Sequence, residues 1–256
     1  MACQQLRSTS LPVRPHALVQ ELEDDLQGLR SGAVASEASP AVLAGRLGDA
    51  YGRIGELVRL PACRDALSSA RWRSAVEAEL DASVALLDLC QRARDAVSSA
   101  KQHARAAQCA LRRGDAAVAN AAMRGYVRCL TKASKQASAR RASSKRAPVD
   151  GETPAAVKVL SEAVAVTVAV LQCVATSLSA RVADTRKSKW CVVSKLLRSD
   201  WSLGVCEELN GDDVVLRTQE MMEELEDDIE DVERGLEHLF RHIVQSRVAL
   251  LNVLTL

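Results

Sequence analysis

The amino-acid sequence predicts an all-α protein, a bundle of long antiparallel helices with a C-terminal coiled-coil-like heptad helix. Apolar residues recur every three or four positions over most of the chain, which is the period of an amphipathic helix. The 256 residues include only 12 Gly and 6 Pro, fewer turn residues than a β-sandwich with many short strands needs. The aromatic residues are three Trp, two Tyr and one Phe, so we expect a core of Ala, Val and Leu.

The N-terminal region divides at about residue 15. We expect residues 1–15 to form an extended segment and residues 16–256 a single helical domain. The composition of the first 20 residues indicates no secretory signal peptide, because a long apolar run is missing, but leaves a plastid transit peptide open. The first predicted helix carries leucines on one face: Leu18, Leu22, Leu26 and Leu29.

The next helix has an unusual second stripe of glycines. Ser39 and Pro40 form a typical helix start, and Pro61 ends the apolar pattern. Within this helix, residues without side chains fall at spacings of three and four: Gly45, Gly48, Gly52 and Gly55. Each glycine costs a helix about 1 kcal/mol relative to Ala, so the helix either frays or packs closely against another helix. We favour close packing.

A long helix without internal Gly or Pro follows from Ala70 to about Gly114. Asp115 is a good N-cap for another helix, which we expect to end near Lys135. Residues 134–152 begin with a run of Ser, Ala, Lys and Arg and are predicted to be a disordered basic loop.

The most apolar helix is predicted over residues 155–180. Residues 163–180 carry no charge, and this length is at the lower limit for a membrane span. Lys158 and Glu162 lie at one end, and several Thr, Ser and Gln side chains interrupt the run. A buried central helix is therefore favoured over a membrane-embedded one.

The C-terminal segment has the clearest pattern. Spacings alternate between three and four over more than four heptads, at Met222, Leu225, Ile229, Val232, Leu236, Leu239, Ile243, Ser246, Leu250 and Val253. Such a seam predicts a helix of 35 residues or more that packs at a shallow angle on another long helix. Both an intramolecular bundle and a coiled coil with a second chain satisfy it.

No catalytic, cofactor or metal site is predicted. The eight cysteines include no C-x-x-C pair, which indicates reduced structural thiols inside a cell. Phosphate-binding glycine motifs are missing. His238 and His242 share a helix face without a third ligand, so we expect a surface pair.

The net charge of +1 conceals two opposite blocks. Residues 101–146 hold twelve basic residues and one acid, whereas residues 207–233 hold thirteen acids and one basic residue. The blocks either dock on each other or form separate surfaces for partners of opposite charge. Aromatic residues are nearly missing from the basic block, which argues against nucleic-acid binding.

These patterns define the candidate functional residues. The candidate interaction surface combines cations of the basic block with residues of the heptad helix: Arg124, Arg128, Lys132, Lys135, Arg140, Arg141, Leu236, Leu239, Phe240 and Ile243. Ser143 follows two arginines and is a candidate phosphorylation site for a basophilic kinase. The expected partners are proteins that bind through helix faces, with self-association as one option; membrane association is not favoured.

Several blocks resemble a known plant family. Residues 7–16, Arg-Ser-Thr-Ser-Leu-Pro-Val-Arg-Pro-His, resemble the N-terminal signature of the plant BYPASS-related proteins. Further similar blocks occur in the family's order at residues 56–61, 80–90, 190–197 and 235–254. The resemblance implies a mostly helical plant protein without known catalytic activity, linked to root and shoot development.

The resemblance also bears on location and function. Because the N-terminal signature belongs to the family domain, we expect it to be retained and the protein to be cytoplasmic, with a plastid or membrane location as the alternative. We expect a non-enzymatic interaction or scaffold protein in developmental signalling. The alternatives are an enzyme or regulator that controls synthesis of a small mobile signal, and a membrane-associated adaptor.

Overall fold

A computed structural model describes residues 17–35, 38–143, 153–183 and 211–255. All regular elements in these ranges are helices, which confirms the predicted all-α fold. The helices are α1 (Ala17–Ala35), α2 (Pro40–Arg59), α3 (Pro61–Ser68), α4 (Arg73–Arg112), α5 (Ala116–Ser143), α6 (Ala155–Ala183) and α8 (Gly211–Leu254). The extended segment predicted for residues 1–15 lies outside the described residues.

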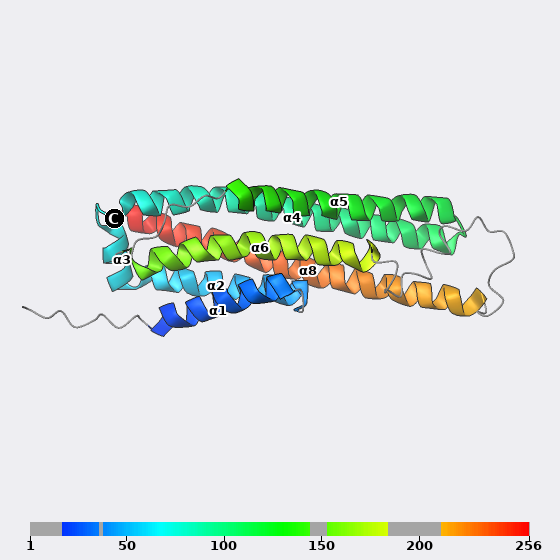
Figure 1. Ribbon diagram of the computed structural model, residues 1–256, viewed down its shortest axis with the longest axis horizontal. Helices are drawn as coiled ribbons and strands as arrows, with labels where there is room; N and C mark the ends of the chain where they lie inside the picture. The colour runs from blue at the N-terminus through cyan, green and yellow to red at the C-terminus, as the bar shows by residue number, and fades with distance from the viewer. Residues whose placement is uncertain (1–16, 36–37, 144–152, 184–210, 256) are drawn as a thin grey trace, which may run out of the picture.

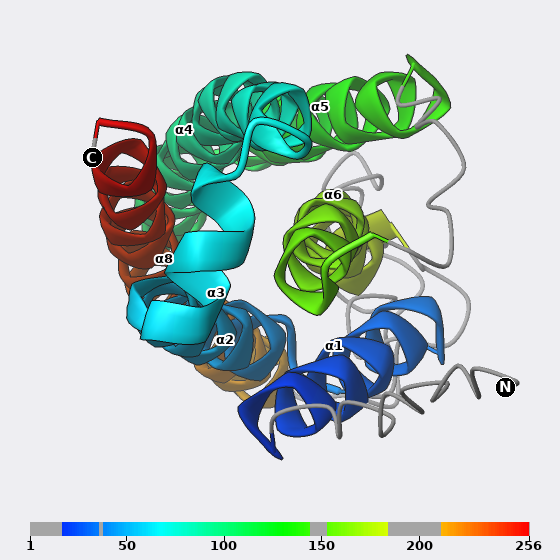
Figure 2. The same ribbon diagram turned by 90° about the vertical axis from the view of Figure 1, so that its left-hand side faces the viewer.

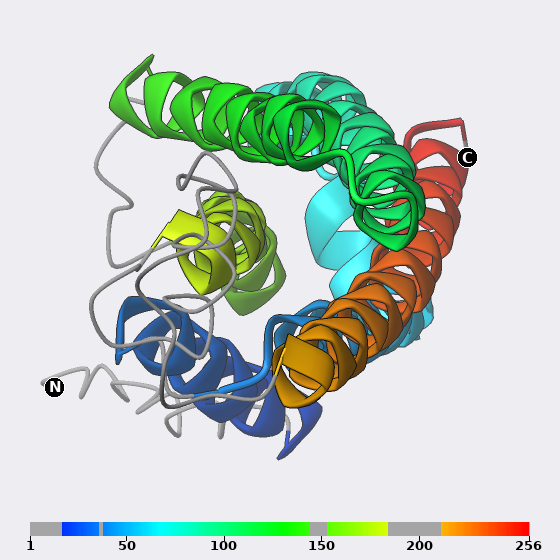
Figure 3. The same cartoon turned by 90° about the vertical axis from the view of Figure 1, so that its right-hand side faces the viewer.

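The bundle is elongated, and its long helices run along its length (Figure 1). Helix α4 runs antiparallel to both α5 and α8, so α5 and α8 point in the same direction. Viewed from either end, α5, α4, α8, α2 and α1 follow one another around α6 (Figures 2 and 3). This order places α4 between α5 and α8, an arrangement that determines which charged side chains meet.

A tight turn joins α4 to α5 at the predicted position. Gly114 has a φ of 74°, a left-handed conformation that glycine adopts without strain. The Gly114 and Asp115 backbone N–H groups donate to the carbonyl oxygens of Leu111 and Ala110, at 3.0 and 2.9 Å. Asp115 then caps α5, because its Oδ1 accepts from the Val118 backbone N–H at 3.0 Å.

Helix α5 is longer than predicted. Residues 134–143 were expected to begin a disordered loop, but they continue α5 to Ser143, so this prediction is wrong for those ten positions. Ala133 and Ala137 lie four residues apart and are buried, and Ala has the highest helix propensity. Two arginines in the last turn also face the negative end of the helix dipole. The rest of the predicted loop, residues 144–152, lies outside the described residues.

Helix α6 is the predicted central helix. Its length and composition are sufficient for a membrane span, but 67% of the relevant window is buried inside the bundle. Two tyrosines fix it to its neighbours: Tyr126 donates from its hydroxyl to the Leu178 carbonyl oxygen, and Tyr51 and Thr167 share a hydrogen bond between hydroxyls, both at 3.0 Å. Burial of these polar groups is therefore compensated by hydrogen bonds.

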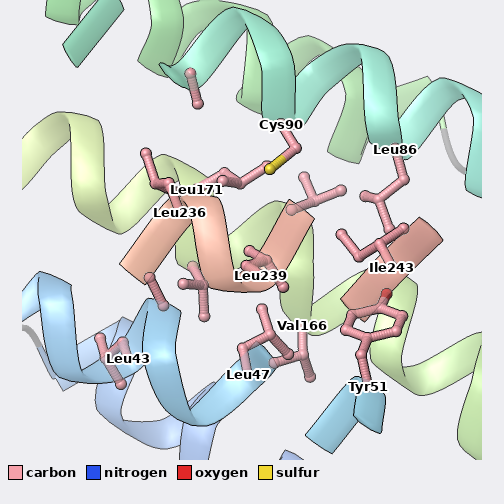
Figure 4. Packing of buried hydrophobic residues seen from close by; sticks show 14 of the residues in the cluster. Leu43, Leu47, Tyr51, Leu86, Cys90, Val166, Leu171, Leu236, Leu239 and Ile243 are labelled. Carbon is pink, nitrogen blue, oxygen red and sulfur yellow. The ribbon is translucent and has the colours of Figure 1, made fainter. Parts of the chain in front are cut away.

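The heptad seam of α8 lies in the core of the same chain. All ten seam residues from Met222 to Val253 are buried, including Ser246. Figure 4 shows Leu236, Leu239 and Ile243 among leucines from α2 and α4. Full burial contributes roughly 1.5–3 kcal/mol for each such aliphatic side chain. The intramolecular packing predicted as one of two options is therefore the one that the fold uses for these residues.

Candidate interaction surfaces

An ionic contact joins α4 to α8. Lys101 Nζ lies 2.8 Å from Glu233 Oε2 and 3.1 Å from Glu230 Oε1, and Arg105 Nε lies 2.6 Å from Glu226 Oε1. The hydrogen bond to Glu233 raises the pKa of Lys101, and the hydrogen bond from Lys101 lowers the pKa of Glu230. Both shifts mean that the ionised forms are favoured in the folded protein.

Two further cations, one on α4 and one on α6, form ion pairs with acids of α8. Arg94 on α4 pairs with Glu237 and lies 5.0 Å from the centre of the Phe240 ring. Arg181 at the end of α6 pairs with Asp228. Arg94, Glu237 and Arg181 lie outside the two charged blocks, so the predicted docking of one block on the other is confirmed for Lys101 and Arg105.

The predicted basic residues of α5 do not share in this docking. Arg124, Arg128, Lys132 and Lys135 are exposed, and no ion pair joins them to any acid among the described residues. They lie opposite the buried face of the helix, which includes Met123, Tyr126, Leu130 and Ala133. We call these four cations the α5 basic stripe. Helix α5 contains no acid of its own, so the stripe presents uncompensated positive charge to solvent.

The other predicted α5 residues are less uniform. Arg141 is exposed on another side of the helix, whereas Arg140 is half-buried and has an interaction partner. Ser143 is the last residue of α5, and its side chain lies outside the described part of the structure. Its phosphorylation stays a prediction.

The predicted contribution of the heptad helix to an interaction surface is wrong for three of four residues. Leu236, Leu239 and Ile243 are at most 1% exposed, because α2 and α4 pack against the seam. Phe240 lies beside the seam, where it is half-buried under the Arg94 guanidinium. The heptad period predicted which residues form the seam. It did not indicate whether helices of the same chain or of a second chain pack against them.

The contact between α2 and α8 explains the glycine stripe. Gly48 faces the His238 ring, and a Cβ built on Gly52 would lie 3.2 Å from His242 Nδ1. Across the contact, a Cβ on Gly235 would lie 2.9 Å from the Ala41 carbonyl oxygen. Close helix packing at these glycines, predicted from the sequence, is therefore confirmed. The backbone N of Gly45 would lie 3.4 Å from a Cβ on Gly235, but a Cβ added to Gly45 itself points away from this contact and would meet no atom within 4 Å.

The two histidines are less exposed than a surface pair would be. Their rings are 4.4 Å apart, and His238 Nε2 lies 2.8 Å from Asp49 Oδ1. His242 Nδ1 is buried without a hydrogen-bond partner, and desolvation lowers the pKa of this ring. The sequence shows both the glycines of α2 and the histidines of α8 that meet in this contact. Periodicity along one helix does not indicate which other helix packs against it, so the contact could not be predicted.

The described residues include no cluster of three or more His, Cys, Asp or Glu that would hold a metal ion. Burial raises the pKa of the Cys90 thiol to about 12 and keeps it protonated, whereas Cys109 is exposed. A shallow groove between α4 and α8 is lined by Arg94, Asp95, Glu237, His238 and Arg241. Arg94 and Glu237 already pair with each other there.

The comparisons with known proteins support the family resemblance. No curated protein and no solved structure gives a significant match. The model of the family described as Protein BPS1 matches residues 45–253, from the second turn of α2 to the last turn of α8. The match includes the helices that carry both the ionic contact and the glycine contact. The chain therefore belongs to the BPS1 family, the BYPASS-related plant family that its sequence blocks resemble.

Proposed function

We propose that this protein is a non-enzymatic interaction protein of plant development, which acts in root and shoot growth by presenting the outer faces of its long helices to other proteins. Membership of the BPS1 family supports the developmental setting. The rigid bundle supports a scaffold role, since helices of 28 and 40 residues hold surface side chains at fixed spacing.

The α5 basic stripe is the observation that carries this proposal. The fold pairs Arg94, Lys101 and Arg105 of α4 with acids of α8, yet it leaves four cations on α5 facing away from the core. Exposed charge of one sign accelerates the encounter with partners of opposite sign and suppresses wrong partners. An acidic protein surface is the partner chemistry that this face fits.

A complementation experiment tests the proposal. Plants that lack the protein receive either the wild-type chain or the α5-reversed variant, in which Arg124→Glu, Arg128→Glu, Lys132→Glu and Lys135→Glu are combined. The matched control reverses four exposed cations outside α5 that form no ion pair with any described residue: Arg59, Arg64, Arg112 and Arg113. Root and shoot growth, protein abundance and helical content are measured for each line.

We expect the control variant to restore growth and the α5-reversed variant to fail at equal abundance. Restoration by the α5-reversed variant would show that the stripe is not a recognition surface. Failure of both variants would show that growth depends on total surface charge, which also contradicts the proposal.

We also propose a cytoplasmic location. The burial of α6 inside the bundle supports it, because a helix that packs on α1, α2, α4 and α5 has no need of lipid contact. Fractionation of plant cells that express a C-terminally tagged chain should recover the protein in the soluble fraction. Recovery in the membrane pellet or in plastids would reject this location.

A further inference from the structure

Helix α8 carries a second charged stripe, of the opposite sign, on its outer face. Glu220, Glu223, Asp227 and Asp231 are exposed and lie opposite the buried seam. Asp231 pairs with Arg234 on the same helix, and the other three form no ion pair with any described residue. We call these four acids the α8 acidic stripe. They differ from the acids that dock on α4, which lie on the flank of the helix.

The α5 basic stripe and the α8 acidic stripe match in number and spacing. The cations are four, four and three residues apart, and the acids are three, four and four residues apart. Each stripe therefore spans about 16 Å of helix. In an antiparallel alignment, each cation lies opposite an acid at constant register: Arg124 with Asp231, Arg128 with Asp227, Lys132 with Glu223 and Lys135 with Glu220.

The two stripes do not meet within one molecule. Helix α4 lies between α5 and α8 in both end views (Figures 2 and 3). Each stripe also points away from the core, because it is opposite the buried residues of its own helix. The acids on the flank of α8 already form ion pairs with Lys101 and Arg105 of α4; these acids are Glu226, Glu230 and Glu233. The outer stripes are therefore available to a second molecule.

We propose that the partner of the α5 basic stripe is the α8 acidic stripe of a second copy of this chain. The proposal rests on the proposed function, in which the outer helix faces are the recognition surfaces, and it names the partner. Charge complementarity favours a second copy over an anionic membrane, since a membrane accounts for the basic stripe alone. A second copy accounts for both stripes and for their equal charge and length.

The contact is heterologous, since it joins α5 of one copy to α8 of the next. Each copy in a pair keeps one basic and one acidic stripe free, so assembly continues beyond two copies as the concentration rises. The paired side chains are solvent-exposed, and salt screens such pairs strongly. Association is therefore weak, reversible and restricted to low ionic strength.

Sedimentation velocity of the full chain tests the proposal. The α8-reversed variant combines Glu220→Lys, Glu223→Lys, Asp227→Lys and Asp231→Lys, and it is compared with the wild-type chain and the α5-reversed variant. At about 0.1 M NaCl the wild-type sedimentation coefficient should rise with protein concentration, and at about 0.5 M the rise should disappear because the Debye length shortens.

The two reversed variants give the sharper test. Each alone presents only one sign of charge on these faces, so we expect its self-association to weaken by at least about tenfold. An equimolar mixture presents both signs again and should associate as the wild type does. Circular dichroism verifies the fold, and the single substitutions Arg128→Glu and Asp227→Lys replace the fourfold variants if those unfold.

Three results would overturn the inference: a wild-type chain that stays monomeric at low salt, reversed variants that still self-associate, or a mixture that does not. Binding of the monomeric wild type to phosphatidylserine vesicles would assign the basic stripe to a membrane instead. These outcomes are separate from those of the plant experiment. A monomeric chain whose α5-reversed variant still fails to restore growth would retain the proposed function with a different acidic partner.

Discussion

Helix α8 makes two different kinds of contact, close backbone packing with α2 and ion pairs with α4. On the α2 side, the helices approach closely because glycines remove side chains from both surfaces, at Gly48 and Gly52 on α2 and at Gly235 on α8. On the α4 side, long charged side chains bridge the helices through Lys101 and Arg105. The first contact depends on shape, and the second depends on charge.

The difference predicts how each contact tolerates change. A close backbone contact has no flexible group that can move aside, so the addition of even one methyl group destabilises it. Ion pairs near the surface involve flexible chains that water can replace, so their loss costs less and depends on salt. Substitutions at the two sides of α8 should therefore differ in size and in salt dependence.

The largest effect is expected at Gly235. A Cβ there would lie 2.9 Å from the Ala41 carbonyl oxygen and 3.1 Å from Ala44 Cβ, so Gly235→Ala should force α2 and α8 apart. Overpacking of this kind costs about 1–3 kcal/mol. Gly45→Ala is the matched control, because its new methyl group meets no atom within 4 Å and should stabilise the helix by up to about 1 kcal/mol. Urea denaturation measures both variants, and equal changes would show that shape does not govern the α2 side.

A smaller effect is expected at Lys101. Lys101→Met keeps the aliphatic part of the side chain but removes the charge that pairs with Glu230 and Glu233. The free energy of unfolding should fall by about 1 kcal/mol or less, because the network is partly exposed. The difference from wild type should shrink in about 1 M NaCl, where the Debye length is about 3 Å. A difference that survives high salt would assign the loss to packing.

The next effect depends on pH. Desolvation lowers the pKa of His242, and the nearby charged groups are His238 and Arg241 on α8 and Asp49 on α2. Because the folded state binds the proton less readily than the unfolded state, stability is complete above the unfolded pKa of about 6.5 and falls as the pH drops through the lowered folded value.

Thermal unfolding between pH 7.5 and pH 5.5 measures this effect. His242→Gln should flatten the dependence of Tm on pH in this window, since the buried titrating group is removed. An equally steep profile in the variant would place the titrating group elsewhere.

The smallest effect on stability is expected on α5. The α5-reversed variant changes four exposed side chains that have no ion pair among the described residues, so its Tm should change little. A large loss of Tm would show that the basic stripe belongs to the fold, as Lys101 does, and would remove the contrast between docked and free cations.

Local sequence patterns predicted most helices. The heptads of α8, the apolar run of α6 and the turn at Gly114 and Asp115 each depend on neighbouring residues, and all lie where the sequence placed them. The glycine stripe predicted a close helix contact, because the cost of several helical glycines requires a compensating approach. Short α3, which has eight residues and one buried side chain, carried too weak a period to be predicted.

Long-range pairing could not be predicted from the same patterns. The basic block is one cluster in the sequence, but the fold divides it. Lys101 lies beside α8, whereas Arg128 belongs to α5, which α4 separates from α8 (Figure 3). Ser and Lys at positions 134–143 concealed the helical period of Ala133 and Ala137. The sequence shows which residues are charged. Whether such a charge is neutralised depends on which helices the fold places side by side.

The contact of α2 with α8 also has a consequence for biosynthesis. Helix α2 ends at Arg59 and α8 begins at Gly211, so translation at about 5–20 residues per second separates them by on the order of ten seconds. During that time the glycine surface of α2 is bare, and the core residues beside it, such as Leu43 and Leu47, lack their final neighbours. The packing of α2 therefore stays incomplete until α8 has been synthesised, so the bundle can close fully only late in translation.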